Sequence, residues 1–359
     1  MKMILRSILL LLSIALVTAC KDKKKEVETQ MAEVEATVPT VRFVKDLEHK
    51  KIAVFLNGTL FTNYIYDGST PKPVLYPLIT RSGKTLTRGF PFEPRPGERV
   101  DHPHHVGLWF NYGNVNGLDF WNNSFAIPED KKDAYGTIVP EQIVSLDSVN
   151  GILTTKSLWQ SPDGVDLIEE TTRFYFSEIG NTRQIDRVAT LKALEDVEFK
   201  DNKEGMLGVR VARQLEMPSD KPDIFTDANG IATEVKALDN SGVTGNYLTS
   251  EGKTGDDAWG TRAKWTTLYG TMNKEPVSIT ILDNPQNIGY PTYWHARGYG
   301  LFAANPLGQA VFSDGKETLD YKLKKGNSVT FKYRILIHNG TELAKEQLDS
   351  TFVNFSKEE

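Results

Sequence analysis

Cysteine is almost absent from this chain of 359 residues, because Cys20 is the only one. A disulfide within the chain, a thiolate zinc site and an iron–sulfur cluster each need more than one thiol, so all three are excluded. Any bound metal must therefore be held by nitrogen and oxygen atoms. A cysteine nucleophile is excluded as well once Cys20 carries the lipid predicted below.

Clustered positive charge, long apolar runs and nucleotide-binding motifs are also missing. The formal net charge is -5 with acidic and basic residues interspersed, which argues against a nucleic-acid partner. Beyond the first 20 residues, no apolar run approaches the ~20 residues of a membrane span. The sequence lacks Gly-x-x-x-x-Gly-Lys-Ser/Thr, Gly-x-Gly-x-x-Gly, His-Glu-x-x-His and Gly-x-Ser-x-Gly. We therefore expect no nucleotide cofactor, no zincin-type proteolysis and no standard hydrolase triad.

The N-terminus has the pattern of a bacterial export signal. Lys2 and Arg6 precede an apolar run over 8–17, and Val-Thr-Ala-Cys at 17–20 resembles a lipobox. We predict a lipoprotein signal peptide over 1–19, a lipid on Cys20 and a disordered, charged tether over 20–40. The protein is then expected in the cell envelope, anchored to a bacterial membrane through Cys20 and facing the periplasm or the surface.

Alternating apolar residues predict mostly antiparallel β-structure in a single domain over 41–359. In the stretch 328–338, apolar side chains fall on every second residue, as in a half-buried strand. Asn-Gly and Asp-Gly pairs, with 28 Gly and 17 Pro, separate many such short runs. We expect a large antiparallel β-sandwich with an excursion over 219–257.

Helix is expected only at the C-terminus of the chain. Thr341 can cap a segment in which Ala344, Leu348, Phe352 and Phe355 share one face at helical spacing. The pattern predicts a short helix that packs against the edge of a sheet.

The segment "DHPHHVGLWFNYGNVNGLDFW" at 101–121 contains three of the six histidines. In an extended backbone His102 and His104 point to one face, and Asp101 and His105 to the other. Two imidazoles at this spacing can bind a divalent metal, with a third ligand from His295, Glu93, Asp119 or Glu204. The alternative is that these histidines are neutral, hydrogen-bonded supports of the fold.

Aromatic and amide side chains follow the histidines closely. Trp109, Asn111, Asp119 and Trp121 combine apolar faces with directional hydrogen-bonding groups. A sugar needs both, because its C–H face stacks on aromatic rings while its hydroxyls donate and accept hydrogen bonds. We therefore expect a carbohydrate or a sugar-derived small molecule as the partner.

A second concentration of such residues lies at 283–306, "DNPQNIGYPTYWHARGYGLFAANP". Trp294, His295 and Arg297 stand together there, and Asn305 closes the segment. Arginine offers a rigid fork of donors, and histidine exchanges protons near neutral pH. The alternative is an aromatic corner of a sheet with Arg297 in an ion pair.

Further candidates lie in three other segments. They are Arg88, then Glu204 and Arg210 in "KEGMLGVRVA", and Trp259 and Arg262 in "DDAWGTRAKW". Glu204 beside a histidine would supply an acid and a base whose environments differ. Any one of these charged residues can equally belong to a surface salt bridge.

Six segments together resemble the PmoA-like family of exported bacterial proteins. They are "VFLNGTLFTNYIY", "KPVLYPLITRSGKTLTRGFP", the segment 101–121, "KEGMLGVRVA", "WGTRAKW" and "NPQNIGYPTYWHARGYGLFAANPLG". The family's label, methane oxygenase, does not fit, because this chain has none of the long apolar helices of that membrane subunit. The resemblance implies a galactose mutarotase-like supersandwich with a carbohydrate-binding face.

Mutarotase-like chemistry implies that a histidine protonates a ring oxygen and that a carboxylate removes the anomeric proton. His102, His105 or His295 would take the first role and Glu204 or Asp119 the second, although no late strand glutamate aligns with the base of those enzymes. Our main hypothesis is acid–base catalysis on a sugar by His102, His105, Glu204 and His295. The alternatives are a non-catalytic glycan-binding lipoprotein and a metal-dependent lyase or hydrolase that uses His102 and His104. The predicted substrate-binding residues are Arg88, Trp109, Asn111, Asp119, Trp121, Arg210, Trp259, Arg262, Trp294, Arg297 and Asn305.

Overall fold

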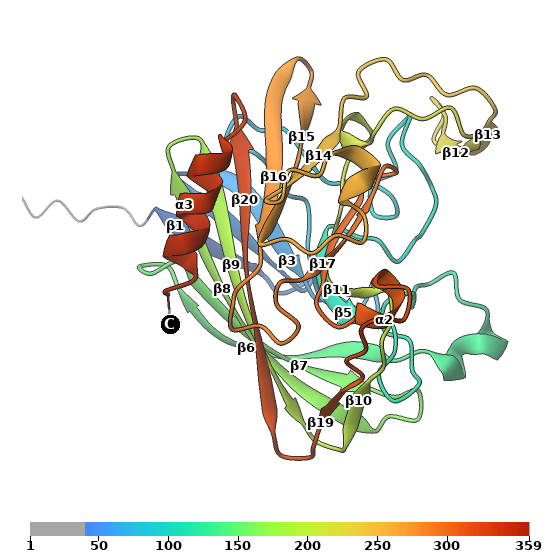
Figure 1. Cartoon of the computed structure of the whole chain (residues 1–359), viewed down its shortest axis with the longest axis vertical. Helices are drawn as coiled ribbons and strands as arrows, with labels where there is room; N and C mark the ends of the chain where they lie inside the picture. Colours follow the sequence, from blue (N-terminus) through green and yellow to red (C-terminus); the bar gives the residue numbers. More distant parts are fainter. Residues whose placement is uncertain (1–39, 359) are drawn as a thin grey trace, which may run out of the picture. The chain divides into compact units, whose positions relative to one another are not determined.

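Two large antiparallel sheets form the framework of the protein in a computed structural model that describes residues 40–358 (Figure 1). The first sheet has the order β1 (Val41–Asp46), β2 (Lys51–Leu56), β3 (Thr59–Ile65), β4 (Val74–Leu75), β5 (Leu108–Tyr112), β11 (Gly205–Arg210), β18 (Leu301–Asn305) and β17 (Tyr293–Arg297). The predicted signal peptide, the lipidation site Cys20 and nearly all of the predicted tether lie outside the described residues.

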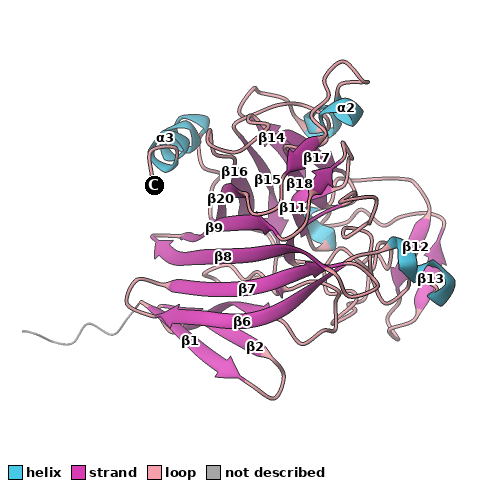
Figure 2. Ribbon diagram, turned by 90° about the horizontal axis from the view of Figure 1, so that it is seen from below, coloured by secondary structure: helices cyan, strands magenta, loops and turns pink. Residues whose placement is uncertain are grey.

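The second sheet also has eight strands, and Figure 2 shows β6 to β9 side by side within it. Its order is β14 (Asn246–Thr249), β15 (Trp265–Met272), β16 (Glu275–Leu282), β20 (Ser328–Asn339), β9 (Thr182–Ala193), β8 (Asp166–Ile179), β7 (Ile152–Gln160) and β6 (Thr137–Asp147). The two minor pairs are β10 (Val197–Phe199) with β19 (Tyr321–Leu323), and β12 (Asp223–Thr226) with β13 (Ala232–Val235). The predicted all-β antiparallel class is confirmed.

The inward faces of the two sheets share one hydrophobic core. Rings from opposite sheets meet there, since Phe61 on β3 lies 6.2 Å from Phe176 on β8, and Phe110 on β5 lies 5.8 Å from Phe331 on β20, between centroids. Along β20, Phe331, Tyr333, Ile335 and Ile337 are buried as the alternation predicts. Burial of each large apolar side chain stabilises the fold by roughly 1.5–3 kcal/mol.

The short C-terminal helix is confirmed, with a correction to its start and its packing. Helix α3 (Lys345–Phe355) begins after Ala344, whose N–H donates to Gln347 Oε1 over 2.8 Å, so Thr341 is not the cap. Its buried residues Leu348, Phe352 and Phe355 pack on Trp265, Leu282 and Leu336 of β15, β16 and β20. The helix therefore covers the outer face of the second sheet instead of its edge.

The remaining helices are short. They are α2 (Gln309–Phe312) and the 3-10 helices η1 (Glu129–Ala134), η2 (Arg213–Leu215) and η3 (Gly255–Ala258). The excursion between β11 and β15 contains the hairpin of β12 and β13, which extends from the sheets in both views (Figures 1 and 2). Within residues 40–358, no helix combines the length and the apolar character that crossing a membrane requires.

Candidate functional site

The candidate site lies on the face of the first sheet that points away from the shared core, called here the outer face. Side chains alternate along a strand, so the neighbours of a core residue point the other way. Trp109 on β5, Arg210 on β11, and His295 and Arg297 on β17 all alternate with residues of the core. Because β5, β11, β18 and β17 are neighbours, these side chains from distant segments occupy one surface.

The histidine segment before β5 forms a turn, which corrects the extended backbone expected there. His102 has φ +44°, and the His105 N–H donates to the His102 carbonyl over 3.0 Å. Arg88 fixes this turn, since its two Nη atoms donate to the carbonyls of Asp101, His102 and His105 over 2.8–3.2 Å. Because of the turn, the His102 ring stacks on the His105 ring, and the His104 ring meets the His102 ring edge-on.

Asp101 is the electrostatic centre of the site. Its Oδ1 accepts from Arg88 Nη1 at 2.5 Å and from Arg210 Nη2 at 2.6 Å, and its Oδ2 accepts from His102 Nδ1 at 2.6 Å. Burial alone would raise the pKa of Asp101, but Arg210, the His102 hydrogen bond and Arg88 hold that pKa well below its ordinary value. Asp101 is therefore an anion that fixes the His102 ring with Nε2 outward, and the side chain of His102 is 42% exposed.

Four aromatic rings, beginning with Tyr299 and His102, stack one on another next to Asp101. His102 lies between Tyr299, at a centroid distance of 5.2 Å, and His105, at 4.8 Å, and His105 stacks on Trp109 at 5.2 Å. Gly208 makes room for the indoles, because a Cβ there would lie 2.6 Å from Trp109 Cζ2. The stack runs from half-buried Tyr299 through exposed His102 to buried His105 and Trp109, and it restricts the orientation of the His102 ring.

Glu204, His295 and Arg297 form the second part of the site. His295 Nδ1 donates to the Lys203 carbonyl over 3.0 Å and lies 3.8 Å from Glu204 Oε2, while its Nε2 accepts from Arg297 Nε over 3.2 Å. Burial, with Arg297 and Lys203, lowers the pKa of His295 to about 3. His295 is thus neutral, with both nitrogens hydrogen-bonded, and Glu204 and Arg297 lie on its two sides.

The structure brings Glu204 close enough to His102 for their charges to interact. Burial raises the pKa of the Glu204 carboxyl, whereas Lys203 and the charge of His102 oppose this rise. The side chain of Glu204 is 15% exposed, with Lys203 Nζ 3.4 Å away. Three of the predicted residues, Glu204, His295 and Arg297, therefore lie together on the outer face, and the charge of His102 reaches the same carboxyl.

His104 and His105 are enclosed, in contrast to His102. Burial lowers the pKa of His104, with Lys72 as the next cause, and burial lowers that of His105, with His104 and Arg210 next. His105 Nδ1 accepts from Arg210 Nη1 over 3.2 Å. Both imidazoles are therefore neutral, which fits the alternative that these histidines support the fold. A catalytic role for His105 stays a prediction.

Several predicted substrate-binding side chains lie beneath the surface. Arg88, Trp109, Asn111, Trp121, Arg210 and Asn305 are each at most 1% exposed. They support the exposed groups from below, and their direct contact with a ligand stays a prediction. Asn305 shows how, since its Nδ2 donates to the Asn202 carbonyl over 2.8 Å and so fixes the segment that carries Glu204.

The last four predicted residues divide between the site and other regions. Trp259 stands beside the site, with Arg297 Cζ 4.7 Å from its ring centroid. Asp119 caps its own turn, accepting from the N–H groups of Trp121 and Asn122 at 2.9 Å. Trp294 enters the core, and Arg262 donates to two carbonyls and to Glu317, so neither is presented on the outer face.

The predicted metal site has two imidazoles but no third ligand within residues 40–358. His102 and His104 lie at a centroid distance of 5.6 Å with their rings at 78°, and His102 Nδ1 is bonded to Asp101. No group of three His, Cys, Asp or Glu side chains in this described part is arranged to hold an ion. Metal binding stays a prediction that these residues do not support by themselves.

The sequence reasoning missed three residues that the structure adds to the site. Lys72 is buried with its Nζ donating to the His104 carbonyl over 2.8 Å, and burial lowers its pKa to about 7. Tyr299 stacks on His102, and Gly208 makes room for Trp109. Only Tyr299 carried a signal in the sequence, as part of the aromatic segment that contains His295.

Several solved structures are similar to this chain at low sequence identity. Solved structures similar to it include a GH36 α-galactosidase of Geobacillus stearothermophilus, with TM-score 0.37, 11% identity, and coverage of 84% of this chain and 41% of that one. A putative aldose 1-epimerase of Escherichia coli K12 has TM-score 0.36 and 12% identity over 84% of this chain and 99% of that one. A galactose mutarotase related enzyme of Lactobacillus acidophilus has TM-score 0.32 and 10% identity over 85% and 99%.

Similarity at this level carries no argument about activity or substrate. The chain spans about two fifths of the length of the α-galactosidases it matches. The comparison with curated proteins found no match. The matching family model does not carry the PmoA-like name, so that resemblance is not confirmed. This model matches residues 51–352, and the chain therefore belongs to the family of unknown function DUF6807.

Proposed function

We propose that this protein acts on a sugar or sugar derivative by acid–base chemistry at the outer face of the first sheet, with His102 and Glu204 as the proton-transfer groups. The observation that carries the proposal is the hydrogen bond between the Asp101 carboxylate and Nδ1 of His102. A carboxylate on Nδ1 fixes the tautomer and leaves Nε2 free to take or give a proton. Two buried arginines hold the carboxylate ionised, so the orientation of the imidazole is built into the fold.

Glu204 supplies a second titratable group with a different environment. Its burial keeps the carboxyl a weaker acid than an exposed glutamate, while Asp101 stays ionised. Groups whose pKa values are pushed apart can divide the roles of acid and base between them. Neutral His295 positions Glu204 and exchanges no proton itself near neutral pH.

The surroundings of His102 and Glu204 suit a hydroxylated ligand. Tyr299 and Trp259 are half-buried and offer aromatic surface, and Arg297 offers hydrogen-bond donors beside Trp259. Sugars bind to such mixed surfaces through stacking and directional hydrogen bonds. In the cell this site would act at the envelope, through the lipid predicted on Cys20.

The test is conversion of a sugar panel by the protein, followed by proton NMR. Reducing hexoses, hexuronic acids, hexose phosphates and oligosaccharides are incubated with the chain from residue 40, and anomer exchange, elimination and bond cleavage are recorded. We expect at least one sugar to be converted, and we expect His102→Asn and Glu204→Gln each to slow the reaction by about 10²–10⁴-fold.

His49 provides a matched control, because its Nδ1 also contacts a carboxylate, Asp46, at 2.9 Å, but in an exposed hairpin without arginines. His49→Asn should convert the sugar at the rate of the wild type. Equal rates for His102→Asn and wild type would overturn the proposal. Sugar binding without conversion of any panel member would also overturn it, in favour of a glycan-binding role.

A further inference from the structure

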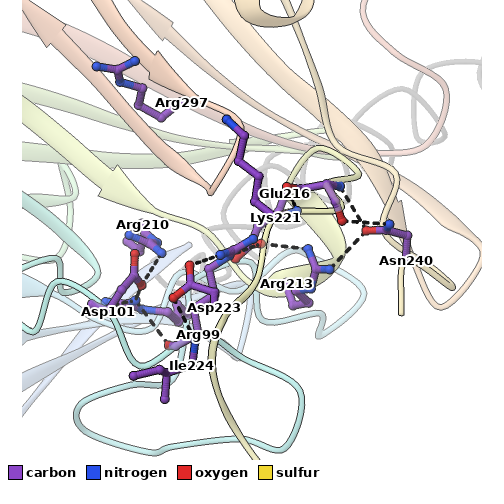
Figure 3. Close-up of polar contacts among 12 residues, drawn as sticks. Arg99, Asp101, Arg210, Arg213, Glu216, Lys221, Asp223, Ile224, Asn240 and Arg297 are labelled. Atoms are coloured by element: carbon purple, nitrogen blue, oxygen red, sulfur yellow. Dashed lines mark hydrogen bonds and ion pairs between the residues drawn. The ribbon is translucent and has the colours of Figure 1, made fainter. Parts of the chain in front are cut away.

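Arg297 differs from Arg88 and Arg210 in having no anionic partner within residues 40–358. Its Nε donates to His295 Nε2 over 3.2 Å, and its guanidinium lies over the Trp259 ring with Cζ at 4.7 Å from the centroid. Among residues 40–358, no hydrogen bond or ion pair uses its two Nη groups. Figure 3 shows Arg297 apart from the dashed network that joins Arg99, Arg213 and Glu216.

This guanidinium is held in place before any ligand arrives. The hydrogen bond to neutral His295 fixes the Nε edge, and the indole face supports the plane of the group. A fixed planar fork with two free nitrogens matches the two oxygens of a carboxylate or phosphate. Holding Arg297 in this geometry before binding lowers the entropy lost when an anion docks.

The charges around Arg297 also favour an anion, although the chain as a whole carries a formal net charge of -5. Arg88 and Arg210 share the single carboxylate of Asp101, and Lys72 has no carboxylate within ion-pair distance in the described part of the chain. Burial is the first cause of the lowered pKa of His104, His105 and His295, and neighbouring positive groups lower all three further. Against the carboxylates of Asp101 and Glu204 stand the cations Arg88, Arg210, Lys203 and Arg297, so the site carries an excess of positive charge.

We propose that the sugar recognised at this face carries an anionic group, a carboxylate or a phosphate, that accepts hydrogen bonds from the two Nη groups of Arg297. This inference rests on the proposed function, because it names the substrate class of the same site. It assigns Arg297 a binding role and leaves proton transfer to His102 and Glu204. His295 then links the two parts, since it contacts both Glu204 and Arg297.

Calorimetric titration with matched ligands tests this inference. The probes are glucose and galactose, the corresponding uronic acids, the corresponding 6-phosphates, and acetate and inorganic phosphate alone. We expect either the uronic acids or the 6-phosphates to bind at least tenfold more tightly than the neutral sugars, and the preferred series identifies the anion. One charged hydrogen bond is worth roughly tenfold to hundredfold in affinity.

Substitution of Arg297 locates the preference. Arg297→Gln should remove the advantage of the anionic sugar while neutral sugars keep their affinity, and Arg297→Lys should keep part of it through charge alone. Arg42→Gln is the matched control, since Arg42 also stacks on a ring, with Cζ 4.2 Å from the Phe55 centroid, and lies on β1. It should leave every affinity unchanged.

The outcomes separate this inference from the function on which it rests. Equal affinities for neutral and anionic sugars, or an unchanged preference in Arg297→Gln, would overturn the anion-binding role while leaving acid–base chemistry on neutral sugars intact. Binding of acetate or phosphate that depends on Arg297, without binding or conversion of any sugar, would support the anion site and overturn the sugar function.

Discussion

Asp101 and Glu216 are each held by two arginines, yet their surroundings differ. Asp101 accepts from Arg88 and Arg210, and Glu216 accepts from Arg99 Nε and Arg213 Nη1, both at 2.8 Å (Figure 3). The side chain of Asp101 is 17% exposed, and that of Glu216 is 1% exposed. What differs is the next group in each network.

Asp101 orients the exposed imidazole of His102, whereas the Glu216 network joins segments in the interior of the protein. Arg99 also pairs with Asp223 at the start of β12, and Arg213 Nη2 donates to Asn240 Oδ1 over 3.2 Å. Glu216 therefore attaches the excursion of β12 and β13 to the body of the fold. An arginine-bracketed carboxylate is therefore a candidate for function where it orients a group that solutes can reach, as Asp101 orients His102.

The largest effect on stability is expected from Glu216→Gln. Two buried guanidinium groups then lose the charge between them, which should lower the free energy of unfolding by about 3 kcal/mol, near the lower end for a broken buried ion pair. The lower end applies because burial already raises the pKa of Glu216 and because Arg99 keeps Asp223. Urea unfolding measures the change.

Glu195 provides the control for Glu216, since it pairs with Lys325 at 2.9 Å on the surface. Glu195→Gln should cost at most about 1 kcal/mol. Equal costs for the two substitutions would show that the buried network does not hold the excursion in place.

His102→Asn should show the opposite profile to Glu216→Gln. The substitution removes the stacking on Tyr299 and His105, but asparagine can still donate to Asp101 and tolerates the positive φ of this position, so the free energy of unfolding should change by only about 1 kcal/mol. Sugar conversion should nevertheless fall by about 10²–10⁴-fold, as proposed above. Parallel unfolding curves and NMR rate measurements on the same samples check both halves. A destabilisation comparable with that of Glu216→Gln would mean that Asp101 and His102 support the fold in the same way as the Glu216 network.

His295→Gln should change how stability depends on pH. The pKa of His295 is about 3 in the folded protein and about 6.5 in an unfolded chain. Between these values only the unfolded chain binds the proton, so this group costs stability as the pH falls, by about 1.4 kcal/mol per pH unit. Between pH 6 and pH 4, unfolding curves of His295→Gln should therefore depend less steeply on pH than those of the wild type. Identical slopes would contradict a neutral, fully engaged His295.

The smallest effect is expected from Lys203→Ala. Lys203 is half exposed, so the loss of its ion pair with Glu204 should cost at most about 1 kcal/mol of stability. Among the groups that lower the pKa of Glu204, Lys203 comes first, and its removal should therefore raise that pKa further. Carboxyl carbon shifts of glutamate-labelled protein, assigned with Glu204→Gln, measure the titration. An unchanged titration would place Lys203 too far from Glu204 in solution to influence it.

Local patterns in the sequence predicted the strands well and the histidine turn poorly. The alternation along β20 and the Asn-Gly pairs depend on neighbours in the chain, and the structure follows both, with Asn57 and Gly58 at positive φ between β2 and β3. The turn at 101–105 was missed because its conformation depends on Arg88, which lies outside the segment and donates to three of its carbonyls.

The sequence by itself determined the all-β class, the terminal helix and the residue types available for chemistry, because side-chain alternation and turn propensity act over a few residues. Only the tertiary structure decided which of those residues meet, since sheet order places β5, β11 and β17 close together and burial separates exposed His102 from enclosed His105. Exposure and pairing are properties of the packed molecule, and they distinguish Arg297, whose Nη groups have no partner within residues 40–358, from the arginines that stabilise the fold.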